Sequence, residues 1–167
     1  QKAFKKAGFR ETDIKKKSKH ISFILTFENN EVDTARKIYE KLYTKHGNSY
    51  KSLNWGSHKA QELRFQILTE IGNISQKCIL DVGCGLGHFA DWLQKQGIEF
   101  IYTGLDINIP MLVAARKRLP QYEFIEGNIL DSKILKVRTF DYVFASGIFY
   151  TYKEGALEWQ KKTILKL

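Results

Sequence analysis

Apolar residues along the chain fall into short runs that alternate with stretches of helical periodicity. The runs predict strands at 78–82, 100–106, 123–128 and 140–147. Helices are predicted after the first two, starting at His88 and near Asn108, where Pro110 favours a helix start. Strands that alternate with helices indicate an α/β fold with a doubly wound, mostly parallel sheet and helices on both faces.

Two helices are predicted before the first strand. Residues 31–45 carry apolar side chains at helical spacing, and Gly47 ends that pattern. Residues 57–71 show a second helical pattern. Its inward face is predicted to consist of Ala60, Leu63, Ile67 and Ile71. We therefore divide this part of the chain into N-terminal helices at 31–76 and an α/β core at 77–167.

The segment from Asp81 to Gly87, Asp-Val-Gly-Cys-Gly-Leu-Gly, joins the first predicted strand to the next helix. Glycines at such a junction let the backbone approach a ligand at the helix N-terminus. The dinucleotide fingerprint G-x-G-x-x-G needs its third glycine one residue later, where this chain has His88. A carboxylate at Asp81 is also unfavourable beside a pyrophosphate, whereas it suits a ligand that carries an ammonium and a sulfonium.

This segment resembles the first motif of class I S-adenosylmethionine (SAM)-dependent methyltransferases, D/E-x-G-x-G-x-G. The resemblance runs from about residue 53 to residue 152 and implies a Rossmann-like fold, SAM as the cofactor and transfer of its methyl group. It assigns the methionine end of SAM to Asp81, Gly83, Cys84, Gly85 and Gly87.

Polar residues follow the later strands and are expected at the same sheet edge. Asp106, nineteen residues beyond Gly87, could accept hydrogen bonds from both ribose hydroxyls. The resemblance places Ile107 beside the adenine and matches Asn128 and Ile129 to the position that contacts the adenine amino group. The family often has Asp where this chain has Asn128, whose carbonyl still offers an acceptor.

The resemblance also places Ser146 on the floor of the active site. The sequence Ala145-Ser146-Gly147-Ile148 lacks the N/D-P-P-Y motif found there in DNA and many glutamine N-methyltransferases. This difference argues against amino-purine and amide acceptors.

Helices before the first strand often cover the SAM pocket in this family. Tyr50, Trp55 and Arg64 are candidate contacts, and Arg64 could pair with the SAM carboxylate. Ordinary packing for the aromatic residues, and a solvated position for Arg64, are the alternatives. The catalytic residues stay unassigned. The candidates for a general base are His88, Asp141, Tyr150 and Tyr152, and a structural role is favoured for Asp141.

The chain has a net charge of +9, and residues 1–20 contribute +6 of it. A solvated basic face is favoured there over a specific nucleic-acid site. No apolar run reaches the length of a membrane helix. Cys78 and Cys84 lack a paired metal-ligand spacing, and the four histidines are scattered, so no metal site is predicted. Reduced thiols favour a cytoplasmic protein.

The segment 1–30 is unusual because it contains a strongly apolar predicted strand at 20–27. It resembles the closing hairpin of a class I methyltransferase, which normally follows the core, or the tail of a preceding N-acetyltransferase-type domain. Both alternatives stay open. After the fourth strand only one helix, at about 152–167, is predicted. The sheet edge that this leaves open could pair with a second copy of the chain.

We therefore expect a SAM-dependent methyltransferase that acts on a small-molecule acceptor. A non-catalytic SAM- or nucleotide-binding module is one alternative, supported by the absence of a predicted fifth strand. An RNA methyltransferase that uses the basic N-terminus is another. A nicotinamide-dependent oxidoreductase is disfavoured by Asp81 and His88.

Overall fold

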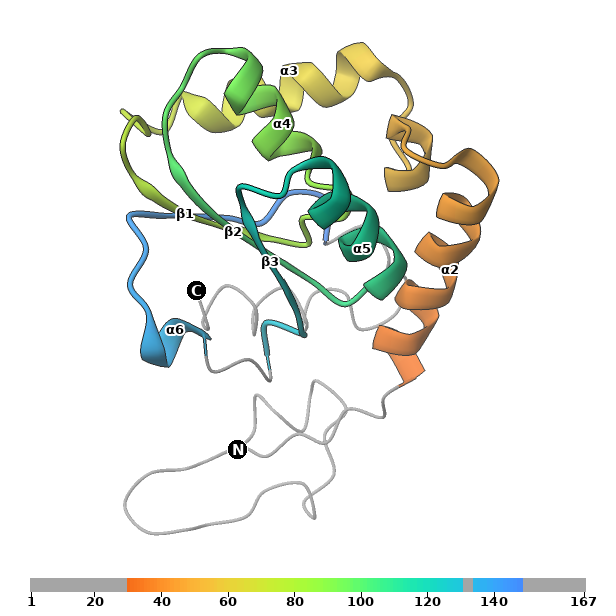
Figure 1. The fold of residues 1–167 in the computed structure, drawn as a ribbon. Helices are drawn as coiled ribbons and strands as arrows, with labels where there is room; N and C mark the ends of the chain where they lie inside the picture. The colour runs from red at the N-terminus through yellow and green to blue at the C-terminus, as the bar shows by residue number, and fades with distance from the viewer. Residues whose placement is uncertain (1–29, 131–133, 149–167) are drawn as a thin grey trace, which may run out of the picture. The chain divides into compact units, whose positions relative to one another are not determined.

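A computed structural model of the chain describes residues 30–130 and 134–148 (Figure 1). The chain divides into two compact units, Gln1–Glu31 and Val32–Leu167. The fold reported below is that of the second unit. The predicted strand at 20–27, the basic residues 1–20 and the predicted helix at 152–167 lie outside the described residues.

Two helices precede the sheet, as the sequence predicts, and a short 3-10 helix that was not predicted lies between them. They are α2 (Asn30–His46), η2 (Tyr50–Leu53) and α3 (His58–Thr69). Ser57 begins α3, because its hydroxyl accepts a hydrogen bond from the Ala60 backbone N–H at 3.0 Å. Ser49 caps η2 in the same way through Lys51.

The sheet contains four described strands, all parallel, in the order β3-β2-β1-β4. They are β1 (Cys78–Val82), β2 (Ile101–Asp106), β3 (Glu123–Glu126) and β4 (Tyr142–Phe144). The connections are α4 (His88–Lys95), α5 (Ile109–Arg118) and the short α6 (Ile134–Val137). The predicted doubly wound parallel sheet is confirmed, although β4 is shorter than the expected run at 140–147.

The strand order reverses at β1. The chain moves outward from β1 to β2 and β3, then returns to the other side of β1 as β4. Loops that leave β1 and β4 therefore diverge at their carboxyl ends, and such a switch point is where ligands bind in open α/β sheets. The fold alone directs attention to the loop after Val82.

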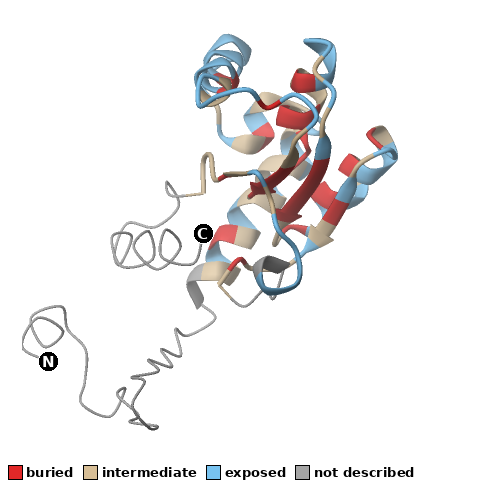
Figure 2. Cartoon of the chain, turned by 90° about the vertical axis from the view of Figure 1, so that its left-hand side faces the viewer, coloured by how far each residue is buried: buried red, intermediate tan, exposed pale blue. Residues whose placement is uncertain are grey.

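Each face of the sheet has its own hydrophobic cluster. Helices α3, α4 and α5 cover one face (Figure 1). Phe65, Phe89 and Leu112 are buried there with Phe124. The opposite face buries a smaller set that consists of Leu80, Val82, Leu105 and Ile129. Figure 2 shows the buried residues concentrated on the central strands and on the helix sides that face them.

The predicted inward face of α3 is wrong. Leu63, Ile67 and Ile71 are 55%, 51% and 64% exposed, and Ala60 is also exposed. The buried face contains Gln61 and Phe65, with Leu68 partly buried behind them. The Phe65 ring packs 5.2 Å from Phe89 and 6.1 Å from Trp92, ring centre to ring centre. Contact with these large rings of α4 fixes the rotation of α3, whereas its own periodicity offers two apolar faces.

Gly104, in the middle of β2, lets the glycine loop lie directly on the sheet. A Cβ atom there would be 2.7 Å from the Cys84 Sγ and 2.9 Å from the Phe124 ring. Both distances are below normal contact, and both neighbours are buried. A side chain at this position would therefore push the loop away from β2.

We expect Gly104→Ala to lower the free energy of unfolding by about 1–3 kcal/mol, the usual cost of overpacking a filled core. Urea denaturation measures the change. Gly56→Ala is the matched control, since a Cβ at Gly56 meets nothing within 4 Å. The control should stay within about 0.5 kcal/mol of the parent. Equal effects of the two substitutions would contradict the close approach of the loop to β2.

Candidate functional site

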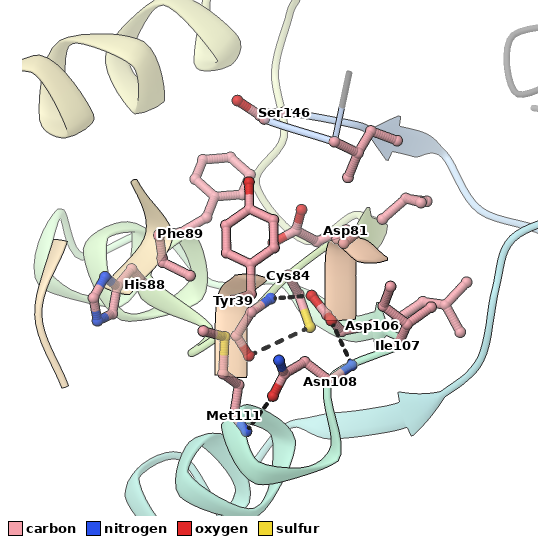
Figure 3. Close-up of a pocket in the computed structure, with 18 of the residues that line it drawn as sticks. Tyr39, Asp81, Cys84, His88, Phe89, Asp106, Ile107, Asn108, Met111 and Ser146 are labelled. Atoms are coloured by element: carbon pink, nitrogen blue, oxygen red, sulfur yellow. Dashed lines mark hydrogen bonds between the residues drawn. The ribbon is translucent and has the colours of Figure 1, made fainter. Parts of the chain in front are cut away.

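A cavity lies at the carboxyl ends of the strands, where the strand order reverses (Figure 3). Its floor is formed by the ends of the strands and the loops that follow them. Its other wall comes from α2, from the segment after η2 and from α3. The cavity is thus enclosed between the α/β core and the helices that precede it in the sequence.

Most of the residues that the sequence assigns to the cofactor line this cavity. They are Asp81, Gly83, Cys84, Gly85, Asp106, Ile107, Asn128, Ile129 and Ser146. Gly87 and Arg64 are not among the lining residues. Gly87 instead starts α4 with a positive φ of 68°, and Arg64 lies on the exposed side of α3. The rotation that buries Phe65 carries Arg64 away from the cavity.

The glycine loop is held against the end of β2 by its own backbone. The N–H groups of Gly83 and Cys84 donate to the Leu105 carbonyl at 2.7 and 3.2 Å. Gly83 and Gly85 have φ values of +75° and +52°, a region that favours glycine. Burial raises the pKa of the Cys84 thiol, which keeps it protonated and inert.

Asp81 is 5% exposed and reaches the cavity from the end of β1. The Tyr102 hydroxyl donates to its Oδ2 at 2.6 Å. Burial raises the pKa of Asp81 to about 7, and the nearby Asp106 carboxylate adds to that rise, while the Tyr102 hydrogen bond opposes it. A buried carboxyl of this kind gains most from a cationic partner.

Asp106 joins the glycine loop to the start of α5. Its Oδ2 accepts from the Gly85 N–H at 2.7 Å, and its Oδ1 accepts from the Asn108 N–H at 2.8 Å (Figure 3). Burial raises its pKa, and these backbone donors work in the opposite direction. Since each carboxylate oxygen can accept two hydrogen bonds, both oxygens keep capacity for a ligand.

Two asparagines add amide groups to the cavity wall. Asn108 is buried and caps α5, with its Oδ1 accepting from Met111 N–H at 3.1 Å. Its Nδ2 has no hydrogen-bond partner among the described residues. The Asn128 Oδ1 accepts from the Leu130 N–H at 3.1 Å, so the turn after β3 already uses part of its capacity. A buried donor without a partner is a group that a ligand acceptor could satisfy.

His88 lines the cavity, but both of its ring nitrogens are engaged. Nε2 lies 2.8 Å from Asn48 Oδ1, and Nδ1 lies 3.1 Å from Gln61 Nε2. Burial, with the positive charge of Arg118, lowers the pKa of His88 to about 4. The ring is therefore neutral at neutral pH and poorly suited to accept a proton from a substrate.

The other candidates for a general base lie elsewhere. Asp141 lies beside the start of β1, where its Oδ2 accepts from the Cys78 N–H at 2.8 Å, in agreement with the structural role favoured from the sequence. Tyr150 and Tyr152 lie outside the described residues. Neither a metal cluster of three His, Cys, Asp or Glu side chains nor a helix suited to crossing a bilayer occurs within 30–130 and 134–148.

The sequence predicted that the helices before the first strand cover the pocket, but it did not identify which residues of α2 line it. Arg36 and Tyr39 lie one turn apart on α2 and both line the cavity. The Arg36 Nε–H donates to the Ile107 carbonyl at 3.2 Å, next to Asp106. Of the predicted lid contacts, Trp55 lines the cavity, whereas Tyr50 packs against His58.

Residues 79–162, half of the chain, match the family model described as a methyltransferase domain. Trans-aconitate 2-methyltransferase from Rhodopseudomonas palustris (strain BisA53) is 35% identical over 83 residues, which cover 50% of this chain and 32% of that protein. A non-reducing polyketide synthase from Penicillium brasilianum is 32% identical over 102 residues, which cover 58% of this chain and 4% of the synthase. The matched segments thus span a third or less of these relatives.

Solved structures share the fold. Magnesium protoporphyrin IX methyltransferase from Synechocystis PCC 6803 with bound SAM superposes with a TM-score of 0.60 at 13% identity, covering 84% of this chain and 71% of that one. Phosphoethanolamine N-methyltransferase 1 from Haemonchus contortus, in complex with phosphoethanolamine and S-adenosylhomocysteine, gives 0.59 at 16% identity, covering 84% and 32%. At these identities the likeness supports the Rossmann-like fold.

We expect the contribution of Asp81 to the stability of the unliganded protein to fall as the pH rises from about 4 to about 7, because folded Asp81 holds a proton that the unfolded chain releases. The lowered pKa of His88 acts in the opposite direction over much of this range, so the Asp81 contribution is measured as the difference between the parent and a variant. Asp81→Asn removes this contribution and leaves those of Asp106 and His88 in place. Relative to that of the parent, the free energy of unfolding of this variant should be about 2.5 kcal/mol higher at about pH 8 than at about pH 5, as the raised pKa implies. Urea denaturation across this pH range measures both.

Tyr102→Phe serves as the second variant in this experiment. It removes the hydrogen bond that favours the Asp81 carboxylate, so the pH-dependent loss of stability should extend to higher pH. Identical pH profiles for the parent and Asp81→Asn would show that Asp81 is ionised in the folded protein throughout this range.

Proposed function

The chain belongs to the methyltransferase-domain family, and from that premise we propose that it binds SAM in the cavity and transfers its methyl group to a small-molecule acceptor. One observation carries the proposal: two acids, Asp81 and Asp106, flank a glycine loop at the switch point of the sheet. Such a site suits a ligand with a cationic end and a ribose, and both groups occur in SAM.

Asp81 would hold the cationic methionine end. Its Oδ2 is occupied by Tyr102, and no hydrogen bond to its Oδ1 occurs among the described residues. An ammonium beside that oxygen would return the pKa of Asp81 toward its ordinary range. Charge-assisted hydrogen bonds of this kind are about twice as strong as neutral ones. The burial of Asp81, which costs stability in the free protein, thereby favours the cationic ligand.

Asp106 would hold the ribose, and the residues around it would hold the adenine. Ile107 and Ile129 offer apolar contacts for the adenine ring, and both line the cavity. Asn128 would reach the adenine edge with its amide. Because its Oδ1 caps the turn at Leu130, its Nδ2 is the freer group and would donate to a ring nitrogen.

Arg64, whose predicted role was to bind the SAM carboxylate, has no support from its position on α3. The N-terminus of α4 is a better candidate, because α4 begins at Gly87 without a side-chain cap and directs its positive end toward the loop. Arg36 lines the cavity beside Ile107 and would instead cover the ribose side.

The chemistry that SAM supplies is an activated methyl group on a sulfonium. The protein would contribute position and enclosure, which can supply about 7–11 kcal/mol of the barrier in such a reaction. Four aromatic residues, Tyr39, Trp55, Phe65 and Phe89, line the cavity and would exclude water from the reacting atoms.

A carboxylate is our preferred class of acceptor. Several relatives of this chain are trans-aconitate methyltransferases, and their named substrate is a carboxylic acid. A carboxylate is already ionised at neutral pH, so its oxygen would attack the methyl carbon as the sulfonium bond breaks, without a general base. This route agrees with the engagement of both nitrogens of His88.

We expect the full chain to bind SAM and S-adenosylhomocysteine more tightly than NAD, because Asp81 repels a pyrophosphate beside the glycine loop. Calorimetric titration with the three ligands under the same buffer conditions tests this. NAD binding without SAM binding would reject the proposed function and favour an oxidoreductase.

Asp106→Ala should weaken binding of S-adenosylhomocysteine by about 1.5–3 kcal/mol, the contribution of hydrogen bonds to a charged group. Glu126→Ala is the matched control. Glu126 is the partner of Asp106 across the β2–β3 pair, yet it is exposed and lies outside the cavity lining. Thermal unfolding of each variant separates loss of binding from loss of fold. An unchanged dissociation constant for Asp106→Ala would place the ribose elsewhere.

A further inference from the structure

We propose that His88 is a positioning residue that latches the lid onto the glycine loop and thereby slows cofactor release. The lid is defined here as residues 32–69, which comprise α2 from Val32 onward, η2 and α3. His88 immediately follows Gly87 and is the first residue of α4. This inference rests on the proposed function only in naming the cofactor, since the latch itself is a contact between parts of the chain.

The latch consists of two hydrogen bonds from one ring. His88 is neutral, so one ring nitrogen donates and the other accepts. Nε2–H is assigned as the donor to Asn48 Oδ1 at 2.8 Å, and Nδ1 as the acceptor from the Gln61 amide at 3.1 Å. Asn48 follows α2 and Gln61 belongs to α3. One side chain of the core therefore joins two separate parts of the lid.

Arg118, at the end of α5, reinforces the same junction. Its Nη2 donates to the Leu86 carbonyl in the glycine loop at 2.6 Å, and its Nη1 donates to Asn48 Oδ1. Asn48 thus contacts two residues of the core, His88 and Arg118, although Asn48 itself is exposed. An exposed residue with two core contacts is more consistent with a closure point than with core packing.

The latch borders the ligand cavity directly. Gln61 and His88 both line it, together with Leu53 and Trp55 from the intervening part of the lid. Leu53 is close enough to Gly85 that a Cβ there would be 2.5 Å from its side chain. Displacing this segment uncovers the glycine loop, and the hydrogen bonds of His88 oppose that displacement. The latch should therefore act mainly on the rate of ligand release.

The first arm of the test needs no ligand. Hydrogen exchange of the full chain is followed at the lid amides of Asn54 and Trp55, which donate to the Lys51 and Tyr50 carbonyls. His88→Ala should speed their exchange several-fold, whereas amides of the β1–β2 ladder should not change. Asn48→Ala should act in the same direction, and it keeps the test decisive if His88→Ala does not fold.

The second arm measures S-adenosylhomocysteine release by stopped-flow tryptophan fluorescence, with Trp55 in the cavity wall as a reporter. His88→Ala should raise the dissociation rate constant about tenfold, the effect expected from losing its hydrogen bonds. The association rate constant should change less. His88→Asn can present an amide oxygen near the position of Nδ1 and keep the bond to Gln61, so it should give partial rescue.

His58→Ala is the matched control, because His58 is an exposed histidine of the same lid whose ion pair with Glu62 and ring contact with Tyr50 both lie within the lid. It should leave both measurements unchanged. Unchanged lid exchange and unchanged release in His88→Ala and Asn48→Ala would overturn the latch. If the parent protein binds no S-adenosylhomocysteine, the proposed function fails, while the exchange arm still decides whether the latch exists.

Discussion

The site depends on the close packing of the glycine loop against the end of β2. Gly83 and Cys84 donate to the Leu105 carbonyl, and Asp106 accepts from Gly85, so the first half of the loop is hydrogen-bonded to the end of the strand. Gly104 removes the side chain that would keep Cys84 away. This contact sets the distance between the two acids and fixes where α4 begins. A shift of the loop would move both the cation site and the ribose site.

The same packing has an energetic consequence at Asp81. The carboxyl is removed from water beside a second acid, and its pKa rises to about 7. Ionised Asp81 therefore lowers the stability of the free protein near neutral pH, and a cationic ligand relieves this cost. Such a local loss of stability in the free protein is typical of a binding site, because binding of the ligand recovers it.

Local sequence order explains what could be predicted. The strand-loop-helix around Asp81 and the acid at Asp106 follow from neighbouring residues and a parallel sheet, so their arrangement at one edge could be anticipated. The rotation of α3 could not be anticipated, because α3 has two apolar faces and only the contact of Phe65 with α4 determines which of them is buried. The same contact leaves Arg64 on the exposed side of α3, the solvated position that the sequence had left open as an alternative. The role of Arg36 depends on where α2 lies in space, which its periodicity does not indicate.

The lid and the buried acid act on the same equilibrium. Burial of Asp81 is what makes its carboxylate a strong partner for a cation, and the lid wall of the cavity contributes to excluding water from it. If the lid opens, water returns to Asp81, the interaction with the ligand weakens, and release becomes easier. A neutral His88 that holds Asn48 and Gln61 therefore supports binding indirectly, by keeping the environment of Asp81 dry. The lid contacts of His88 and the carboxylate of Asp81 are therefore coupled, because both depend on keeping water out of the cavity.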